Sequence, residues 1–396
     1  MRIRRLHISD YRNFERLDVD LAGGVSIFVG DNAQGKSNLL EAVYLLATMR
    51  GLRAETDAQM IRREALVEGV LPAARVVAEG ETRDGPLRLE VTVVARPGPQ
   101  GPIGTKTVKV NGVAKRISDA VGRLTAVLFT AEDMEMITGP PSDRRRFLDI
   151  ALAQVEPAYS SARSRFERVL TQRNHLLKRI REGEAKHDEL EFWDEGLARD
   201  GGFILQRRAT ALEQLAALAS ESHEQLSPGD TLGMGYQPRL DGESVNLADA
   251  SVEEAATAYI SALHRSVGRD VAAGMTLQGP HRDDLAIDLN GLAAAGYASR
   301  AQLRTIALAL RLAEARFLTD RRGEPPVLLL DDFLSEMDAG RRESVLGAVA
   351  GSEQILVTGT DWDRFTPEFR AGASLFSVET GSLRPLDPPL PRTGNS

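Results

Sequence analysis

The chain contains no cysteine. This absence excludes a disulfide framework, thiolate zinc sites, iron–sulfur clusters and a cysteine nucleophile, and it is consistent with a reducing compartment. No uninterrupted apolar run approaches the roughly 20 residues that a membrane-spanning helix needs. The basic N-terminus is followed by no apolar segment of the kind found in secretory signals. We therefore expect a cytoplasmic protein that makes no contact with a membrane.

The chain also lacks an excess of positive charge. Its 49 Lys and Arg residues stand against 57 Asp and Glu, which gives a formal net charge of -8. A protein that coats nucleic acid through a general positive field is thereby excluded, so any DNA contact has to come from a local patch. Hydrophobic residues make up 42% of the 396 residues, which is enough for a sizeable core in roughly two or three compact units.

The pattern of apolar residues predicts strands, then helices, then strands again. A buried strand ends at Gly30, and an amphipathic helix is predicted over residues 37–49. From Pro157 onward, two stretches with helical spacing are joined near Gly183, which predicts a short antiparallel helical hairpin. Such a hairpin is either an ordinary part of a helical lobe or a functional arm. An apolar strand is predicted again at 327–330.

The clearest chemical motif is a phosphate-binding loop of the Walker A type. Residues 30–37 match the pattern G-x-x-x-x-G-K-[ST], and they lie between a buried strand and an amphipathic helix, as this motif requires. Backbone N–H groups of such a loop point at phosphates, Lys36 reaches the β- and γ-phosphates, and the Ser37 hydroxyl binds Mg²⁺. The residues predicted to bind ATP are Gly30, Asp31, Asn32, Ala33, Gln34, Gly35, Lys36, Ser37 and Asn38.

A second acidic motif supports the first. The apolar strand at 327–330 ends in Asp331 and Asp332. Beside the strand of the phosphate loop, such a strand brings the first carboxylate to Mg²⁺ and the second to the attacking water. We therefore predict Ser37 and Asp331 as metal ligands, and Asp332 and Lys36 as catalytic residues. A whole helical lobe is inserted between these two motifs.

Two further motifs point to one class of nucleotide-binding protein. The segment 297–304, which contains Ser299 and Gln302, resembles the signature motif of ABC-type ATPases in their SMC-like branch. The segment 335–338, which ends at Asp338, resembles their D-loop. With five more segments, the chain resembles the RecF family of DNA replication and repair proteins. The five matching segments are Asp10–Phe14, Phe129–Asp133, Pro141–Asp149, Gln172–Asn174 and Gly279–Leu285.

This resemblance implies an α/β fold: an ABC-type P-loop ATPase head, with a mixed sheet and helices, plus an inserted, mainly helical second lobe with a short antiparallel helical hairpin. We expect the ATPase lobe at 1–130 and 275–382, the helical lobe at 131–274 and a disordered tail at 383–396. The resemblance also implies a homodimer that holds two ATP molecules between its heads. Lys36 of one subunit would face Ser299, Gln302 and Asp338 of the other.

The functional expectations follow from the same resemblance. Proteins of this family act with RecO and RecR at single-strand gaps and stalled forks, where they help to load RecA during DNA repair, DNA replication and the SOS response. The chain departs from the family at Ala301, where the signature has glycine. It also has no switch histidine in the segment 356–361, so that role passes to Thr358 or Thr360 or is absent. Asp332 is shorter than the usual glutamate base, which favours a weak DNA-dependent ATPase used as a switch.

A local positive patch is the candidate DNA contact. Between residues 144 and 181 the chain has ten Arg and Lys residues against three acids. Such a patch can contact phosphates of duplex DNA, whereas the scarcity of aromatic residues disfavours stacking on single strands. The alternative is a solvated helix face with internal ion pairs, and the Arg144–Arg146 run equally fits an ATP-facing or dimer-facing role. The candidate contacts are Arg144, Arg145, Arg163, Arg173 and Lys178.

Three other classes of protein share parts of this pattern. The ATPase subunit of a membrane transporter has the nucleotide motifs, but it keeps them much closer together and lacks so large a helical lobe. A structural SMC-type tether needs far longer helical arms. A small-molecule kinase with a P-loop needs neither the signature at 299–302 nor the D-loop at 335–338. We retain the transporter subunit as the alternative.

Overall fold

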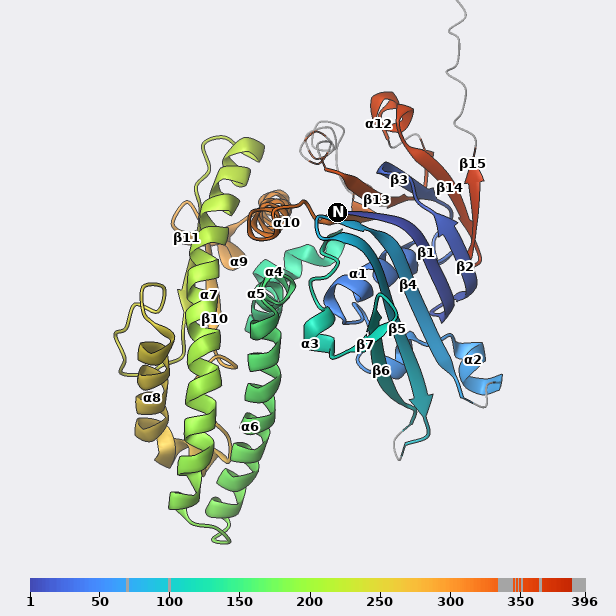
Figure 1. Ribbon diagram of the computed structural model, residues 1–396. Helices are drawn as coiled ribbons and strands as arrows, with labels where there is room; N and C mark the ends of the chain where they lie inside the picture. Colours follow the sequence, from blue (N-terminus) through green and yellow to red (C-terminus); the bar gives the residue numbers. More distant parts are fainter. Residues whose placement is uncertain are drawn as a thin grey trace, which may run out of the picture. The chain divides into compact units, whose positions relative to one another are not determined.

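The computed structural model in Figure 1 contains two compact units. One consists of Met1–Glu132 together with Leu318–Ser396, and the other of Asp133–Phe317. The residues that the structure describes are 1–68, 71–98, 101–333, 345, 347, 349, 352–362 and 365–386.

The first unit contains an antiparallel sheet of six strands in the order β2-β1-β4-β5-β6-β7. Every neighbouring pair in it is antiparallel. Buried and more exposed residues alternate along β5, as expected for a sheet with one face on the core. An Asn111-Gly112 turn, a pair typical of tight hairpins, joins β6 to β7, and both residues have positive φ, 50° and 82°. The strands are β1 (Arg2–Tyr11), β2 (Phe14–Asp20), β4 (Ala73–Thr82), β5 (Gly85–Arg96), β6 (Ile103–Val110) and β7 (Val113–Lys115).

A second sheet of six strands in the same unit carries the nucleotide motifs. Its order is β15-β14-β3-β13-β12-β8, and all pairs are parallel except β14 with β15. Every residue of β8, β12 and β13 is buried, which explains their continuous apolar runs. The strands are β3 (Gly24–Val29), β8 (Ala126–Thr130), β12 (Val327–Asp331), β13 (Gln354–Gly359), β14 (Ser374–Glu379) and β15 (Ser382–Leu386).

The order of this sheet corrects one expectation about the two nucleotide motifs. The strand that ends in Asp331 does not lie beside β3, the strand of the phosphate loop, because β13 pairs with both and separates them. Helix α1 (Lys36–Thr48) packs on this sheet against β8, β12 and β13. The remaining described helices of this unit are η1 (Asp57–Met60), α2 (Arg63–Glu68), α3 (Ile117–Ala120) and α12 (Pro367–Ala371).

The second unit is mainly helical. Its longest helices, α6 and α7, pack side by side and are joined through the short helix η3, which makes the predicted antiparallel hairpin (Figure 1). A three-stranded sheet with the order β11-β10-β9 lies in the same unit. The elements are η2 (Ala131–Met134), α4 (Glu135–Thr138), α5 (Pro141–Val155), α6 (Pro157–Arg181), η3 (His187–Leu190), α7 (Glu191–Leu226), β9 (Leu232–Gln237), α8 (Val252–Ala273), β10 (Asp284–Leu289), β11 (Leu292–Ala293), α9 (Ala294–Tyr297) and α10 (Arg300–Arg322), whose last residues belong to the first unit.

Local sequence explains where α8 begins and ends and how closely it packs. Ser251 and Glu254 form a capping box at its N-terminus, and Gly274 ends it with a left-handed φ of 66°. On α7, a side chain at Gly202 would collide with the backbone of Ala256 on α8. Glycine at this position therefore permits the close approach of the two helices.

The boundaries of the units differ from the expected ones in two places. Residues 275–317 cluster with the helical unit, although the family resemblance predicts them in the ATPase lobe. The strand β15 extends to Leu386, so residues 383–386 are ordered within the second sheet rather than part of a tail. The rest of the predicted tail, 387–396, lies outside the described residues.

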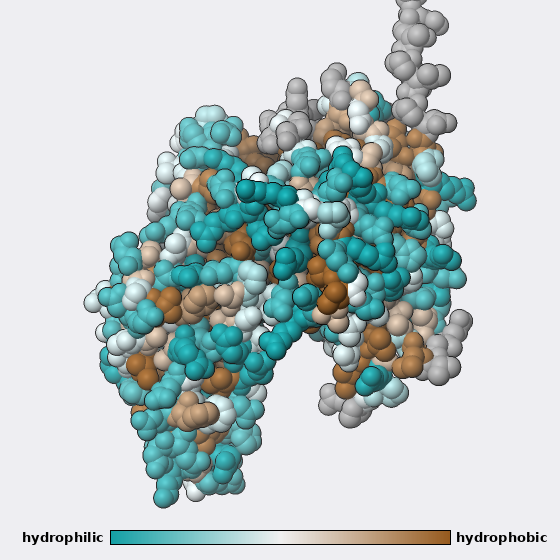
Figure 2. Space-filling view, in the orientation of Figure 1, coloured by the Kyte–Doolittle hydropathy of each residue, from teal (hydrophilic) through white to brown (hydrophobic). Residues whose placement is uncertain are grey.

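Among the described residues, no large apolar area is visible on the face drawn in Figure 2. Hydrophilic residues predominate there, and hydrophobic residues occur in small, separate groups, as is usual at protein surfaces. Among the helices in the described part of the chain, none combines the length and the apolar composition needed to cross a bilayer.

Candidate nucleotide-binding site

The phosphate loop connects the end of β3 to the start of α1. Within it, Ala33 and Gly35 have positive φ values of 65° and 110°, which curve the loop before the helix begins at Lys36. Gly35 occupies the position that caps the helix and has no side chain with which to do so. The first N–H groups of α1 are therefore available to an anion, which the positive end of the helix also attracts.

Lys36 lies inside this loop. Its Nζ donates hydrogen bonds to the carbonyl oxygens of Gly30 at 2.6 Å and Asp31 at 2.8 Å. Burial lowers the pKa of the Lys36 ammonium, and the nearby carboxylates of Asp332 and Asp331 offset part of this effect. A partly desolvated cation at the start of α1, where the first N–H groups of the helix also attract anions, favours a phosphate as its partner.

Asp331 reaches the first turn of α1 from the end of β12. The Ser37 hydroxyl donates to Asp331 Oδ1 at 2.7 Å, although 294 positions separate the two residues in sequence. Burial raises the pKa of the Asp331 carboxyl, and the Ser37 and Thr358 hydroxyls oppose this shift. A buried carboxylate beside a serine hydroxyl supplies the oxygen ligands that Mg²⁺ prefers.

Thr358, near the end of β13, connects the two acids of the second motif. Its hydroxyl donates to Asp331 Oδ1 at 3.0 Å and accepts the backbone N–H of Asp332 at 2.8 Å. Asp332 itself has a positive φ of 47°, unusual for a residue other than glycine, so the chain turns sharply at this point. Thr358 is one of the two candidates for the role of the missing histidine, and it contacts the carboxylate of Asp331 and the backbone of Asp332.

A second group of contacts positions the loop that follows α1. Glu41, a buried residue of α1, forms an ion pair with Arg12 at 2.6 Å. Glu41 Oε1 also accepts the backbone N–H groups of Leu52 at 3.1 Å and Arg53 at 3.3 Å. Arg53 Nη2 lies 3.8 Å from Asp331 Oδ2. Arg12 lies in the segment Asp10–Phe14 that resembles the family, but the sequence alone indicates no role for it.

The signature residues lie at the start of α10, in the helical unit. Ser299 and Gln302 form a reciprocal cap: Ser299 N donates to Gln302 Oε1 at 2.9 Å, and Gln302 N donates to Ser299 Oγ at 3.3 Å. Ser299 and Ala301 are exposed, so their side chains are accessible to another molecule. The D-loop segment 335–338, with Asp338, lies outside the described residues.

Most of the residues predicted to contact DNA instead bind other residues of the helical unit. Arg144 forms a bidentate pair with Asp284, at 2.7 Å and 2.9 Å. Arg145 donates to the Asp283 carbonyl at 2.5 Å. The ion pairs of Arg163 are with Asp149 at 3.3 Å and Glu167 at 2.9 Å. Lys178, by contrast, is exposed on α6. These contacts favour the alternative of a helix face with internal ion pairs.

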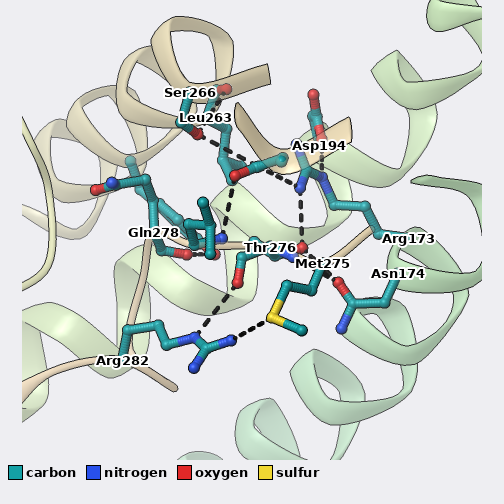
Figure 3. A network of polar contacts seen from close by, with 12 residues as sticks. Arg173, Asn174, Asp194, Leu263, Ser266, Met275, Thr276, Gln278 and Arg282 are labelled. Atoms are coloured by element: carbon teal, nitrogen blue, oxygen red, sulfur yellow. Dashed lines mark hydrogen bonds and ion pairs between the residues drawn. The ribbon is translucent and has the colours of Figure 1, made fainter. Parts of the chain in front are cut away.

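Arg173 contradicts the prediction that it contacts DNA, because its side chain is fully buried. Figure 3 shows it among α6, α7 and the segment after α8. Its Nε donates to Asp194 at 2.6 Å, and its Nη1 donates to Asp270 at 2.8 Å and to Thr276 Oγ1 at 2.9 Å. This arginine therefore holds helices together. In the sequence, Arg173 interrupts an apolar stripe with helical spacing, which is consistent with this role.

The comparisons with known proteins agree with this geometry. The model of the family "RecF/RecN/SMC N terminal domain" matches residues 2–377. The DNA replication and repair protein RecF of Roseiflexus castenholzii is 41% identical over 97% of this chain and 100% of its own length. The RecF protein of Chloroflexus aurantiacus is 40% identical over 97% of this chain and 99% of its own.

Solved structures show the same likeness. A structure described as the recombination mediator protein RecF-ATP in the RecFOR pathway has a TM-score of 0.84 and 29% identity, with 97% of each chain covered. The predicted fold, a P-loop ATPase head with an inserted helical lobe, is confirmed, and the transporter alternative finds no support in these relatives. The chain belongs to the RecF family of DNA replication and repair proteins.

Proposed function

We propose that the chain is an ATP-dependent DNA-binding protein of recombinational repair. It acts with RecO and RecR at single-strand gaps and stalled forks, where it promotes RecA loading and SOS induction. ATP binding joins two chains, and slow hydrolysis separates them again. The observation that carries the proposal is the contact of Ser37 Oγ with Asp331 Oδ1 at 2.7 Å, which completes a nucleotide site from distant parts of the chain. Support also comes from the similar structures, whose descriptions name ATP and the RecFOR pathway.

The residues present fit ATP with Mg²⁺. Lys36 is a cation whose pKa burial lowers, and Asp331 is a carboxyl whose pKa burial raises, so each is destabilised in its charged form without a further partner. A phosphate near Lys36 and a cation between Ser37 and Asp331 would compensate both charges. Bound there, ATP supplies the β–γ phosphoanhydride bond whose hydrolysis resets the switch.

We assign the remaining roles by position in the site. Asp332 orients and deprotonates the attacking water, while Lys36 stabilises negative charge on the phosphates. Ser299, Gln302 and Asp338 complete the site from the partner subunit. The cap between Ser299 and Gln302 supports this assignment, since it fixes both side chains at the accessible start of α10. Hydrolysis is slow because Asp332 is short and because the methyl group of Ala301 crowds the γ-phosphate.

The DNA contact is proposed for the exposed cations of the helical hairpin. Lys178 keeps its proposed role, and the exposed residues Arg168 and Arg181 of α6 join it. Arg144 and Arg163 form internal ion pairs and Arg145 donates to an internal carbonyl, so their removal would act first on the fold. Contacts of this kind go to phosphates and weaken with salt.

The first experiment is light scattering with and without ATP and Mg²⁺, on the wild type and on Lys36→Arg, followed by duplex DNA binding under the same conditions. We expect ATP to drive dimerisation and tighter DNA binding in the wild type, and neither in the variant. A protein that stays monomeric with ATP contradicts the proposal, unless Ala301→Gly restores the dimer. In that case the alanine has disabled the signature motif.

A further inference from the structure

The turn between β14 and β15 lies against the phosphate loop. The backbone N–H of Thr380 donates to Gln34 Oε1 at 2.6 Å, and that of Gly381 donates to the Gln34 carbonyl at 3.0 Å. Asn13, in the turn between β1 and β2, donates from Nδ2 to the same carbonyl at 3.0 Å. Two strand turns that are distant in sequence therefore hold one residue of the loop.

These bonds determine the direction of the next N–H group. The carbonyl of Gln34 and the N–H of Gly35 belong to one peptide group, and in a trans peptide they point in opposite directions. All peptides between described residues are trans. Because Asn13 and Gly381 hold the carbonyl on one side, the Gly35 N–H points to the other. An N–H at this position of a phosphate loop is one of those that bind phosphate oxygens.

Asn13 is itself fixed. Its Oδ1 accepts a hydrogen bond from Asn38 Nδ2 in the first turn of α1 at 2.8 Å. A side chain at Gly35 would collide with the Asn13 amide, and a side chain at Gly381 would collide with the Asn13 carbonyl. The two glycines and Asn13 thus pack in direct contact, and a methyl group at either glycine would displace this arrangement.

The backbone of this turn is strained. Thr380 has a φ of 48° and Gly381 a φ of 74°. A β-branched residue at positive φ is a genuine outlier, and Asn or Gly is usual at the first position of such a turn. The Asn111-Gly112 turn of the same unit follows this rule, with φ values of 50° and 82°. Strain of this kind persists where surrounding contacts impose it, often at functional sites.

We propose that the Thr380-Gly381 turn, together with Asn13, is a positioning element for nucleotide phosphates. It holds the 34–35 peptide so that the Gly35 N–H faces the bound phosphate, although neither the turn nor Asn13 touches the nucleotide. The inference rests on the proposed nucleotide site. It assigns a role in nucleotide affinity to the C-terminal hairpin β14–β15, which lies outside all the motifs of the site.

Gly381→Ala tests the proposal, with Gly112→Ala as its matched control. Both glycines have positive φ, so both substitutions strain the backbone, but a side chain at Gly112 meets nothing within 4 Å. We expect calorimetric titration with ADP and with ATP to show affinity reduced by about tenfold or more in Gly381→Ala. The affinity of Gly112→Ala should equal that of the wild type.

Two more variants separate the backbone contact from side-chain effects. Asn13→Asp removes the donor to Gln34 and keeps an acceptor for Asn38, so nucleotide affinity should fall. Thr380→Asn retains the backbone N–H in a residue that tolerates positive φ, so affinity should be retained and the melting temperature should rise. Unchanged affinity in both Gly381→Ala and Asn13→Asp would overturn the proposal.

Hydrogen exchange provides a readout that needs no nucleotide. Without nucleotide, amides of residues 30–38 should exchange faster in Gly381→Ala than in Gly112→Ala, because the loop loses a fixed peptide. If the wild type binds neither ADP nor ATP while this difference is present, the proposed function fails, and the turn holds the loop without a role in nucleotide affinity. If the exchange is the same in the two variants, the positioning role is wrong.

Discussion

At the scale of single residues, the geometry of the site depends on hydroxyl groups that form hydrogen bonds with its acidic residues. Thr358 donates to Asp331 and accepts from the backbone of Asp332, so one side chain orients both acids of the second motif. A threonine hydroxyl can donate one hydrogen bond and accept two, which suits this bridging position. Valine has the same shape and no hydroxyl.

Thr358→Val should therefore slow ATP hydrolysis by about tenfold or more, because Asp331 loses a donor and the Asp332 N–H loses the hydroxyl that accepts it. Nucleotide affinity should change less, since Lys36 and the loop remain. Turnover under single-turnover conditions and calorimetric affinity are the two measurements. Thr358→Ser keeps the hydroxyl and should retain most of the activity. A loss that is equal in the serine and valine variants would argue against an orienting hydroxyl.

The imidazole of His281 makes stability depend on pH. Burial lowers the pKa of His281 to about 4, from the ordinary value of 6.5, and its Nε2 donates to the Thr276 carbonyl at 2.9 Å. The folded protein therefore keeps the ring neutral between these values, while the unfolded chain takes up a proton. The stability that this group contributes is fully present above pH 6.5 and is lost as the pH falls towards 4.

We expect the free energy of unfolding to fall by up to about 1.4 kcal/mol per pH unit from this residue alone. His281→Gln can keep the donor and cannot take up the proton, so it should remove this part of the acid sensitivity. Urea unfolding from pH 7 to pH 4.5 measures the effect. His264→Gln, at an exposed histidine of α8, is the control. Parallel curves for the wild type and His281→Gln would contradict the assignment.

At the scale of elements, buried ion pairs hold the helical hairpin to the rest of its unit. Arg173 on α6 reaches Asp194 on α7 (Figure 3). It also reaches Asp270 on α8, and all three side chains are at most 4% exposed. Asn174 accepts the backbone N–H and the hydroxyl of Thr276 at 2.8 Å each. The direction of the long hairpin therefore depends on a few buried polar groups.

Arg173→Met should lower the free energy of unfolding by about 3 to 5 kcal/mol, because two carboxylates remain buried without their cation. Lys178→Ala, on the same helix and exposed, should change stability by less than about 0.5 kcal/mol and weaken DNA binding instead. Chemical unfolding and DNA titration at two salt concentrations distinguish the effects. If Arg173→Met kept normal stability but lost DNA affinity, the conclusion from burial would be wrong, and Arg173 would contact DNA phosphates.

At the scale of the whole molecule, the proposed dimer has two equivalent sites, each formed by both chains. Lys36→Arg damages the phosphate loop of a chain, and Ser299→Arg damages the signature that it presents to its partner. In a homodimer of either variant, both sites are defective. In a mixed dimer the two defects fall in one site, and the other site has Lys36 and Ser299 intact.

Mixing the two inactive variants in equal amounts should therefore restore about a quarter to a half of the wild-type ATPase activity, since each mixed dimer has one intact site of two and each variant pairs poorly with itself. Turnover measured against the mixing ratio should be highest at equal amounts. Ser299→Ala in place of arginine is a milder variant if the larger residue prevents dimerisation. An absence of recovery at every ratio would mean that the sites are not shared between chains.

The sequence by itself determined the nucleotide chemistry and the family. Residues 30–37 form a phosphate loop because local spacing places glycines, Lys36 and Ser37 between a strand and a helix, and such local patterns survive in any tertiary context. The apolar run before Asp331 likewise predicts a buried strand that ends in an acid. The hairpin α6–α7 could also be predicted, since helical periodicity is local.

Only the tertiary structure decided which distant side chains meet. It placed β13 between β3 and β12, buried Arg173 among three helices and brought the Thr380-Gly381 turn to Gln34, 346 positions away in sequence. The charge of an arginine is the same on the surface and in the core, so a count of charges cannot show which arginines pair internally. These outcomes depend on how whole sheets and helices pack, because burial and non-local hydrogen bonds arise only when separate elements come together.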